Sequence, residues 1–83
     1  NYILMQSTGF VDGNGKEIYE GDILTDGNIK FLVCFEEERA WFIMKPILDE
    51  KILLTHYEEL EKSCMHYYEI IDNIYENSEL LTK

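Results

Sequence analysis

The sequence is short of positive charge. Its 83 residues contain seven Lys and Arg against 17 Asp and Glu, which gives a formal net charge of −10 at pH 7. Proteins that bind nucleic acid gain much of their affinity by neutralising phosphates with Lys and Arg, and anionic membrane surfaces also attract basic segments. We therefore expect no direct binding to nucleic acid and none to membranes.

The chain also has few cysteines and no long apolar run. Cys34 lies inside an apolar stretch and Cys64 in a mixed one, so the two do not suggest a disulfide framework. A reduced, cytoplasmic setting fits them best. The apolar runs are far shorter than the roughly 20 residues that a membrane-spanning helix needs. No signal peptide or lipidation motif is visible.

The length allows one domain, 1–83, just above the roughly 70–80 residues at which a single core becomes hard to stabilise. Apolar residues make up 46% of the chain and aromatic residues 13%, which is enough for a small core and argues against global disorder. The chain begins with Asn1 rather than Met, and we therefore expect it to be a fragment or a processed form.

The sequence is rich in residues that form turns. Residues 12–15 read Asp-Gly-Asn-Gly, and the flanking residues 10–11 and 18–19 can pair across them. Gly-Asp at 21–22 and Asp-Gly-Asn at 26–28 mark two further turns. Gly and Asx pairs between short apolar runs are typical of reversals between strands. The first third of the chain therefore predicts short strands and tight turns.

The run 29–35 predicts the best strand, because it is rich in β-branched and aromatic residues and has an apolar side at positions 29, 31, 33 and 35. Residues 40–44 predict its return strand, and the charged residues 36–39 predict the solvated tip between them. Pro46 is expected to end that strand or to place it on an edge of the sheet.

The residue pattern changes in the last third of the sequence. Residues 56–62 contain helix formers, and Tyr57 and Leu60 fall at helical spacing, which predicts a short helix. Residues 68–75 predict a strand broken at Asp72-Asn73, a pair that tolerates bulged backbone. Asn77-Ser78-Glu79 is expected to cap a terminal turn.

Short strands separated by turns every eight to twelve residues indicate a small β-barrel or sandwich with one or two short helices. We expect the core to contain either Trp41 or Phe42, since adjacent residues of a strand point to opposite faces. The other predicted core residues are Ile3, Ile18, Ile23, Phe31, Val33, Ile43, Leu53, Ile71 and Ile74.

Two blocks of the sequence resemble the YopX family, small proteins encoded mainly by bacteriophages and prophages. The first is Leu-Met-Gln-Ser-Thr-Gly at 4–9 followed by Asp-x-Asn-Gly-Lys-Glu-Ile-Tyr-Glu-Gly-Asp-Ile at 12–23. The second is Glu-x-Ile-x-Asn-Ile-Tyr-Glu-Asn-x-Glu-Leu-Leu at 69–81. The resemblance is to the C-terminal portion of the family, whose members often carry a further basic and aromatic N-terminal segment.

Four positions depart from the family pattern. Ser7 stands for an aromatic residue, Phe10 for Leu, Asp72 for glycine and Ser78 for proline. If the glycine serves a positive φ, Asp72 would be tolerated at modest strain. The resemblance implies a mostly β, SH3-like bent barrel in a bacterial host cell, with no established enzymatic activity and no catalytic residues to carry over.

Motifs for cations and phosphates fail on inspection. Asp12-x-Asn14-x-Lys16 begins like a calcium loop, but Lys takes the fifth position and Ile23 the twelfth. We interpret it as a hairpin turn in which Asx side chains bind their own backbone. The glycines at 9, 13 and 15 lack the Gly-Lys-Ser/Thr ending of a phosphate loop.

Two other clusters are weak candidates for chemistry. Glu17, Glu20 and Asp22 have no nucleophile or basic partner at definite spacing, so a turn whose carboxylates bind nearby amides is the preferred interpretation. Cys64-x-His66 with His56 falls short of the four ligands of a structural zinc site. We expect no catalytic residues, no metal and no cofactor.

The function we expect is that of a non-enzymatic phage or prophage accessory protein that contacts a host or phage protein or assembles with itself. The alternative is an acidic nucleic-acid mimic that inhibits a DNA-binding protein. A third class, a hydrolase built on Glu17, Glu20 and Asp22, would need a concave pocket. The predicted interaction surface combines aromatic and acidic residues: Trp41, Tyr57, Tyr67, Tyr68, Glu36, Glu37, Glu38, Glu58, Glu59 and Glu61.

Overall fold

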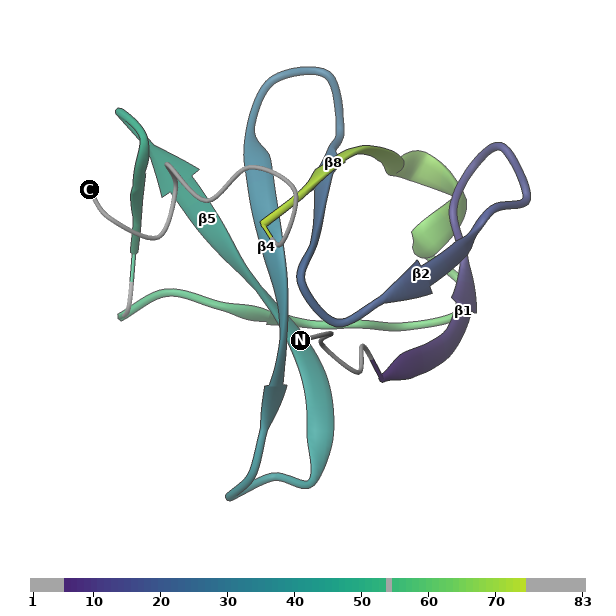
Figure 1. Cartoon of the computed structure of the whole chain (residues 1–83), viewed down its shortest axis with the longest axis horizontal. Helices are drawn as coiled ribbons and strands as arrows, with labels where there is room; N and C mark the ends of the chain where they lie inside the picture. Colours follow the sequence, from purple (N-terminus) through teal and green to yellow (C-terminus); the bar gives the residue numbers. More distant parts are fainter. Residues whose placement is uncertain (1–5, 54, 75–83) are drawn as a thin grey trace, which may run out of the picture.

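The computed structural model describes residues 6–53 and 55–74 (Figure 1). β1 (Ser7–Val11) and β2 (Glu17–Tyr19) form a two-stranded antiparallel sheet. In a second sheet the strands follow the order β6-β5-β4-β3-β8, and β7 also pairs with β5. The strands of this second sheet are β3 (Asp22–Thr25), β4 (Lys30–Glu36), β5 (Trp41–Leu48), β6 (Lys51–Ile52), β7 (Glu58–Glu59) and β8 (Glu69–Asn73).

The prediction of a mostly β fold is confirmed. Every strand pair in the described residues is antiparallel. Over the same residues the two sheets are not joined into a closed barrel, so the SH3-like detail is not shown. Figure 1 places β1 and β2 beside the curved larger sheet, in which β8 lies next to β3.

The predicted hairpins are confirmed in their places. Residues 12–16 connect β1 to β2, residues 26–29 connect β3 to β4, and residues 37–40 form the tip between β4 and β5. Gly15 at φ 80° and Gly27 at φ 102° supply backbone conformations that other residues adopt only at a cost. Turn chemistry thus located the reversals correctly.

The predicted helix at 56–62 is wrong. Glu58–Glu59 form β7, which pairs with Met44 and Ile43 of β5, and the Leu60 N–H donates to the Phe42 carbonyl at 3.1 Å. The Leu60 side chain is buried there, so pairing along β5 outweighs local helix propensity. In the described residues the helical element is a single 3₁₀ turn, η1 (Met65–Tyr67).

β8 contains an irregularity one residue earlier than predicted. Ile23 of β3 pairs with Asp72 of β8 and Leu24 pairs with Ile70, which leaves Ile71 as an extra, bulged residue. The bulge turns the Ile71 side chain outward, where it is 43% exposed, so its predicted place in the core is wrong. Asp72 has no positive φ, and the strain considered for it is absent.

Pro46 neither ends β5 nor lies at the margin of the sheet. It lies inside the strand, opposite Phe31 of β4, and its carbonyl accepts from the Leu53 N–H at 2.8 Å. The N–H and C=O of one residue point to the same side of an antiparallel strand. A backbone N–H at position 46 would therefore point away from β4, toward the side of β5 on which β6 and β7 lie. Its absence costs the β4–β5 ladder no hydrogen bond.

The core lies on both faces of the β3-β4-β5 sheet. The larger cluster contains Ile18, Leu24, Phe31, Val33, Phe42, Met44, Leu60 and Met65. The smaller contains Ile23, Leu32, Ile47 and Ile74. Because both faces are covered, Leu32 is buried as well as Phe31 and Val33, whereas Ile29 is exposed at the end of a turn. Strict alternation therefore underestimated the burial of this strand.

The remaining core predictions divide as follows. Ile43 is fully buried, Phe42 is buried and Trp41 is 44% exposed, so the two adjacent aromatic residues do point to opposite sides. Leu53 is half-buried. Ile3 and the predicted turn at 77–79 lie outside the described residues. No helix in the described part of the chain is long and apolar enough to cross a membrane.

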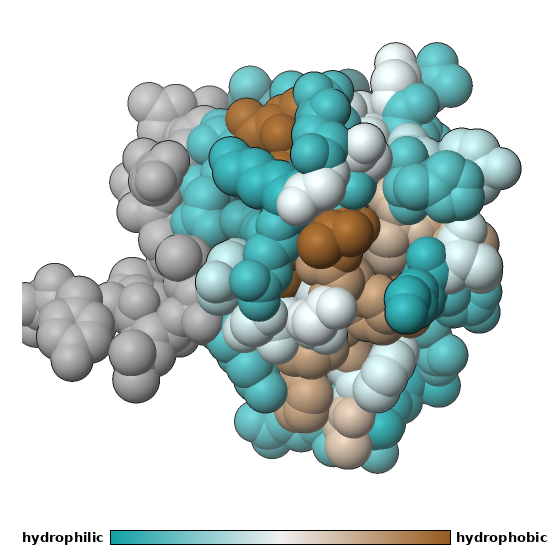
Figure 2. Space-filling model, turned by 90° about the vertical axis from the view of Figure 1, so that its right-hand side faces the viewer, coloured by the Kyte–Doolittle hydropathy of each residue, from teal (hydrophilic) through white to brown (hydrophobic). Residues whose placement is uncertain are grey.

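Figure 2 shows the side of the molecule that lies on the right in Figure 1, where β1, β2 and η1 are drawn. Apolar colours gather in the middle of this face, and hydrophilic residues surround them. Val11 of β1 is 52% exposed and Tyr67 of η1 is 70% exposed. Apolar and aromatic surface is thus available to solvent on an otherwise acidic molecule.

Candidate functional site

The structure brings half of the predicted interaction residues around one hollow, which we call the acidic hollow. It has a volume of about 400 Å³ and lies between β5, β7 and the segment that leads into η1. Its lining residues are Arg39, Met44, Tyr57, Glu58, Glu59, Glu61, Cys64, Met65 and Tyr68. Buried Met44 and Met65 join it to the larger core cluster, against which Tyr68 also packs, and Tyr57 and the three glutamates are exposed.

Arg39 is the one basic residue among the described residues that line the acidic hollow. Its guanidinium carbon lies 4.6 Å from the centre of the Tyr57 ring, and its Nη1 lies 3.4 Å from Oε2 of Glu59. Both partners of the ion pair are about half exposed, at 45% and 48%. Exposed pairs of this kind contribute about 0–1 kcal/mol, so Arg39 is held loosely.

Tyr68 forms the inner wall of the acidic hollow. Its ring packs edge-on against Phe31, with ring centres 5.7 Å apart and planes at 87°. Burial, and then the charge of Glu58, raise the pKa of the Tyr68 hydroxyl. Tyr68 is therefore a neutral phenol at physiological pH, and its orientation is fixed by the core.

The other predicted interaction residues lie outside this hollow. Trp41 packs edge-on against Phe10 at 6.1 Å and donates its indole N–H to the Leu60 carbonyl at 3.1 Å, which attaches it to the segment carrying Glu59 and Glu61. Glu36 pairs with Trp41 across the β4–β5 ladder. The rest are Glu37 and Glu38 on the exposed tip and Tyr67 on η1, whose ring centre lies 4.0 Å from that of His66.

Asp12 confirms the turn interpretation of the failed calcium loop. Its Oδ1 accepts from the N–H groups of Asn14 at 2.9 Å and Lys16 at 2.8 Å, within its own turn. Its Oδ2 accepts from the Ile70 N–H at 3.0 Å, a contact with β8 that local spacing could not reveal. Burial alone would raise the pKa of Asp12, but the three backbone amides outweigh it and lower the pKa.

In the cluster of Glu17, Glu20 and Asp22, the carboxylates of Glu17 and Asp22 accept structural hydrogen bonds. Buried Asp22 accepts from the Tyr19 N–H at 2.7 Å and from the Asn73 side-chain amide at 2.9 Å, as a turn carboxylate is expected to do. Glu17 accepts from the Ser7 hydroxyl. Glu17 and Asp22 line a shallow hollow of about 400 Å³ between β2 and β8, but Glu20 does not.

The cysteines and histidines do not converge. In the described ranges, no three His, Cys, Asp or Glu side chains gather as metal ligands would. Burial raises the pKa of the Cys34 thiol, and Cys34 packs against the smaller core cluster, as predicted for a small hydrophobe. His56 is exposed and lies beside the Thr55 hydroxyl at 3.0 Å.

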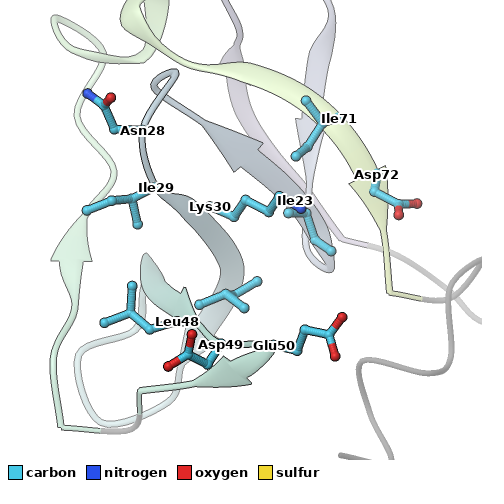
Figure 3. Close-up of a pocket in the computed structure, with 10 residues that line it drawn as sticks. Ile23, Asn28, Ile29, Lys30, Leu48, Asp49, Glu50, Ile71 and Asp72 are labelled. Atoms are coloured by element: carbon cyan, nitrogen blue, oxygen red, sulfur yellow. The ribbon is translucent and has the colours of Figure 1, made fainter.

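A second surface was not predicted. A groove of about 410 Å³, which we call the β8 groove, separates the β5–β6 turn from β8 (Figure 3) and is lined about equally by aliphatic and polar side chains. Figure 3 shows Ile71 on one side of the groove and Ile29 and Leu48 on the other. These side chains are 43%, 37% and 46% exposed. Sequence patterns placed Ile71 in the core and Ile29 on the buried side of a strand, so neither signalled an exposed apolar surface.

Taken together, these features define a small protein of antiparallel strands whose candidate site is an open surface hollow. The chain belongs to the YopX family: the family described as YopX protein matches residues 1–82. The match spans nearly the whole chain, including the middle that carries the acidic hollow, and so extends beyond the two end blocks that first suggested it. No curated protein is significantly similar to the chain.

Proposed function

We propose that the protein is a non-enzymatic accessory protein of phage or prophage origin, which acts in the cytoplasm of the bacterial host by contacting another protein. The acidic hollow is the contact surface. The observation that supports this proposal is the convergence of Tyr57 and Tyr68 with Glu58, Glu59 and Glu61 around a single depression.

The chemistry of the acidic hollow suits recognition. Tyrosine offers large contact area with a polar end and loses little conformational entropy on binding, which is why such residues anchor interfaces. Tyr68 is held by Phe31, whereas Tyr57 is 40% exposed and available to a partner. The carboxylates at the rim would orient a partner of opposite charge and speed its approach.

The proposal of a non-enzymatic role rests on the hydrogen bonds that the buried carboxylates already accept. Asp12 and Asp22 are buried, and both accept backbone hydrogen bonds that hold turns. A general base needs a free carboxylate within reach of a substrate proton in a pocket. The glutamates of the acidic hollow are instead exposed to solvent.

The test is affinity capture from lysates of a host that carries the phage, with the tagged protein and two variants. We expect Tyr57→Ala to lose a partner that wild type retains, and Lys51→Ala, on exposed β6 outside the acidic hollow, to keep it. Retention of every partner by Tyr57→Ala would refute the acidic hollow as the contact surface.

Polyanion mimicry is the second candidate, favoured by the net charge of −10 on 83 residues. In this function the protein would occupy the nucleic-acid site of a DNA-binding protein. Such binding should weaken steeply with salt and should compete with duplex DNA. A partner that is released by neither treatment excludes mimicry.

Self-assembly is the third candidate, favoured by the exposed aliphatic side chains of the β8 groove. A two-fold interface repeats each contact, and Lys30 on one side of the groove could pair with Asp49 of a second copy while the apolar side chains cover one another. Leu48→Asp should then shift an oligomer to monomer in light scattering at matched protein concentration. An unchanged mass would exclude assembly through this groove.

A further inference from the structure

We infer that the acidic hollow takes an arginine side chain of the partner protein, and that Arg39 occupies this position while the partner is absent. The inference rests on the proposed function and names the chemistry of its partner. It depends on the geometry of one cation that the structure already contains at the site.

The acidic hollow fits a planar cation. A guanidinium group stacks on aromatic rings and also donates hydrogen bonds to carboxylates, two properties that an ammonium group combines less well. Arg39 shows both contacts at once, 4.6 Å from the Tyr57 ring centre and 3.4 Å from Glu59. The same lining offers two further carboxylates, Glu58 and Glu61, so the acidic residues outnumber the single internal cation.

Arg39 is poorly placed to satisfy this lining by itself. It stands on the exposed β4–β5 tip, next to Ala40, whose φ of 52° is unfavourable for a residue with a side chain. Its distance to Glu59 is longer than the 2.7–2.9 Å or so of a strong charge-assisted hydrogen bond. A partner arginine that enters deeper, toward Tyr68, can therefore displace Arg39 at low cost.

The other depressions in the described residues give weaker evidence about the chemistry of a partner. The β8 groove combines aliphatic side chains with charges of both signs, and this mixture does not select one chemical class of partner. The hollow between β2 and β8 is lined by Asp22 and Asn73, which already bond each other. The acidic hollow is the depression in the described residues where aromatic rings, carboxylates and a resident guanidinium coincide.

The experiment is an NMR titration of the whole chain with a short peptide, acetyl-Gly-Arg-Gly-amide. The matched control peptides carry lysine or citrulline in place of arginine; citrulline keeps the planar shape and lacks the charge. We expect the arginine peptide to shift the signals of Tyr57, Tyr68 and Glu58, and to bind more tightly than either control.

Two substitutions sharpen the test. Tyr57→Leu should weaken arginine binding about 2- to 5-fold, the loss of one exposed cation–π contact. Arg39→Gln should tighten it, because the internal competitor is removed, whereas Lys51→Gln removes the same charge from exposed β6, outside the lining, and should not. Equal effects of Arg39→Gln and Lys51→Gln would overturn the inference, as would equal binding of the citrulline peptide or lysine peptide.

The two proposals can fail separately. If the arginine peptide does not bind but Tyr57→Ala still loses a captured partner, the contact surface stands and the arginine assignment is wrong. If the peptide binds as expected but no captured partner depends on Tyr57, the arginine site stands and its use as a partner contact is wrong.

Discussion

Asp12 shows how one carboxylate can join segments that lie far apart in the sequence. It holds the β1–β2 turn through Asn14 and Lys16 and reaches β8 through Ile70. We expect Asp12→Asn to lower the free energy of unfolding by about 1.5–3 kcal/mol, because an amide cannot accept on both sides. Urea denaturation at pH 7 measures the change.

The same residue predicts a pH dependence. The native pKa of Asp12 is lowered relative to the unfolded chain, so its stabilising contribution is complete above the ordinary value of about 3.9 and is lost as the pH falls through the native pKa. The difference in unfolding free energy between wild type and Asp12→Asn should therefore shrink below pH 4. A difference that stays constant down to pH 2.5 would contradict this account.

Gly13 and Gly15 allow the effects of steric crowding and of backbone strain to be compared. A Cβ at Gly13 would lie 2.6 Å from the His66 carbonyl oxygen, and the Gly13 N–H donates to the Tyr68 carbonyl at 2.8 Å. Gly15 has φ 80°, and a Cβ there would meet no atom within 4 Å. Gly15→Ala should cost about 1–2 kcal/mol from strain alone.

We expect Gly13→Ala to cost more than Gly15→Ala, because the turn must move away from η1. Thermal unfolding of both variants, compared at the melting temperature of wild type, gives the ranking. The reverse order would show that the β1–β2 turn does not pack against η1 as described.

At the scale of elements, the correction to β8 gives the sharpest stability test. Ile18 is fully buried and brings β2 into the larger core cluster, whereas Ile71 is bulged outward. Ile18→Ala should cost about 2–5 kcal/mol, and Ile71→Ala less than about 0.5 kcal/mol. Denaturant midpoints that are similar for the two variants would restore Ile71 to the core.

Elements defined by local chemistry could be predicted from the sequence. The turns at 12–16, 26–29 and 37–40 depend on glycine, Asx residues and solvated charge, and these signals act within four or five residues. The β4–β5 hairpin followed from them. The opposite faces of Trp41 and Phe42 followed from the two-residue repeat of a strand.

Elements defined by pairing with distant residues could not be predicted from the sequence. Residues 58–59 become a strand because β5 offers them backbone partners. The sequence of the segment itself does not predict this pairing. Leu32 is buried because a second cluster covers the face of the sheet opposite to Phe31 and Val33. In the candidate site, Tyr57 and Tyr68 were expected from composition, but the approach of Arg39 to Tyr57 requires the fold of the hairpin tip.

At the scale of the whole molecule, the net charge of −10 should affect stability. Like charges repel more strongly in the compact state than in the unfolded chain, and salt screens this repulsion. We expect the melting temperature to rise between 20 and 300 mM sodium chloride. A falling melting temperature would mean that attractive ion pairs, such as that between Arg39 and Glu59, outweigh the repulsion.

Charge also separates a defined contact surface from a general polyanion. Glu58 and Glu61 line the acidic hollow, and Glu37 and Glu38 lie on the hairpin tip outside it. Each pair carries the same charge and is exposed to solvent, so replacing each pair with glutamine changes the net charge equally. A mimic should respond equally to both double substitutions, and a contact at the acidic hollow should not.

The most direct measurement is therefore the dissociation constant of a captured partner for these two double variants, determined by calorimetry at 150 mM salt. We predict that Glu58→Gln with Glu61→Gln weakens binding about tenfold or more, equivalent to about 1.4 kcal/mol. Glu37→Gln with Glu38→Gln should stay within about twofold of wild type. Equal losses in the two variants would contradict a contact at the acidic hollow and would assign binding to the overall charge.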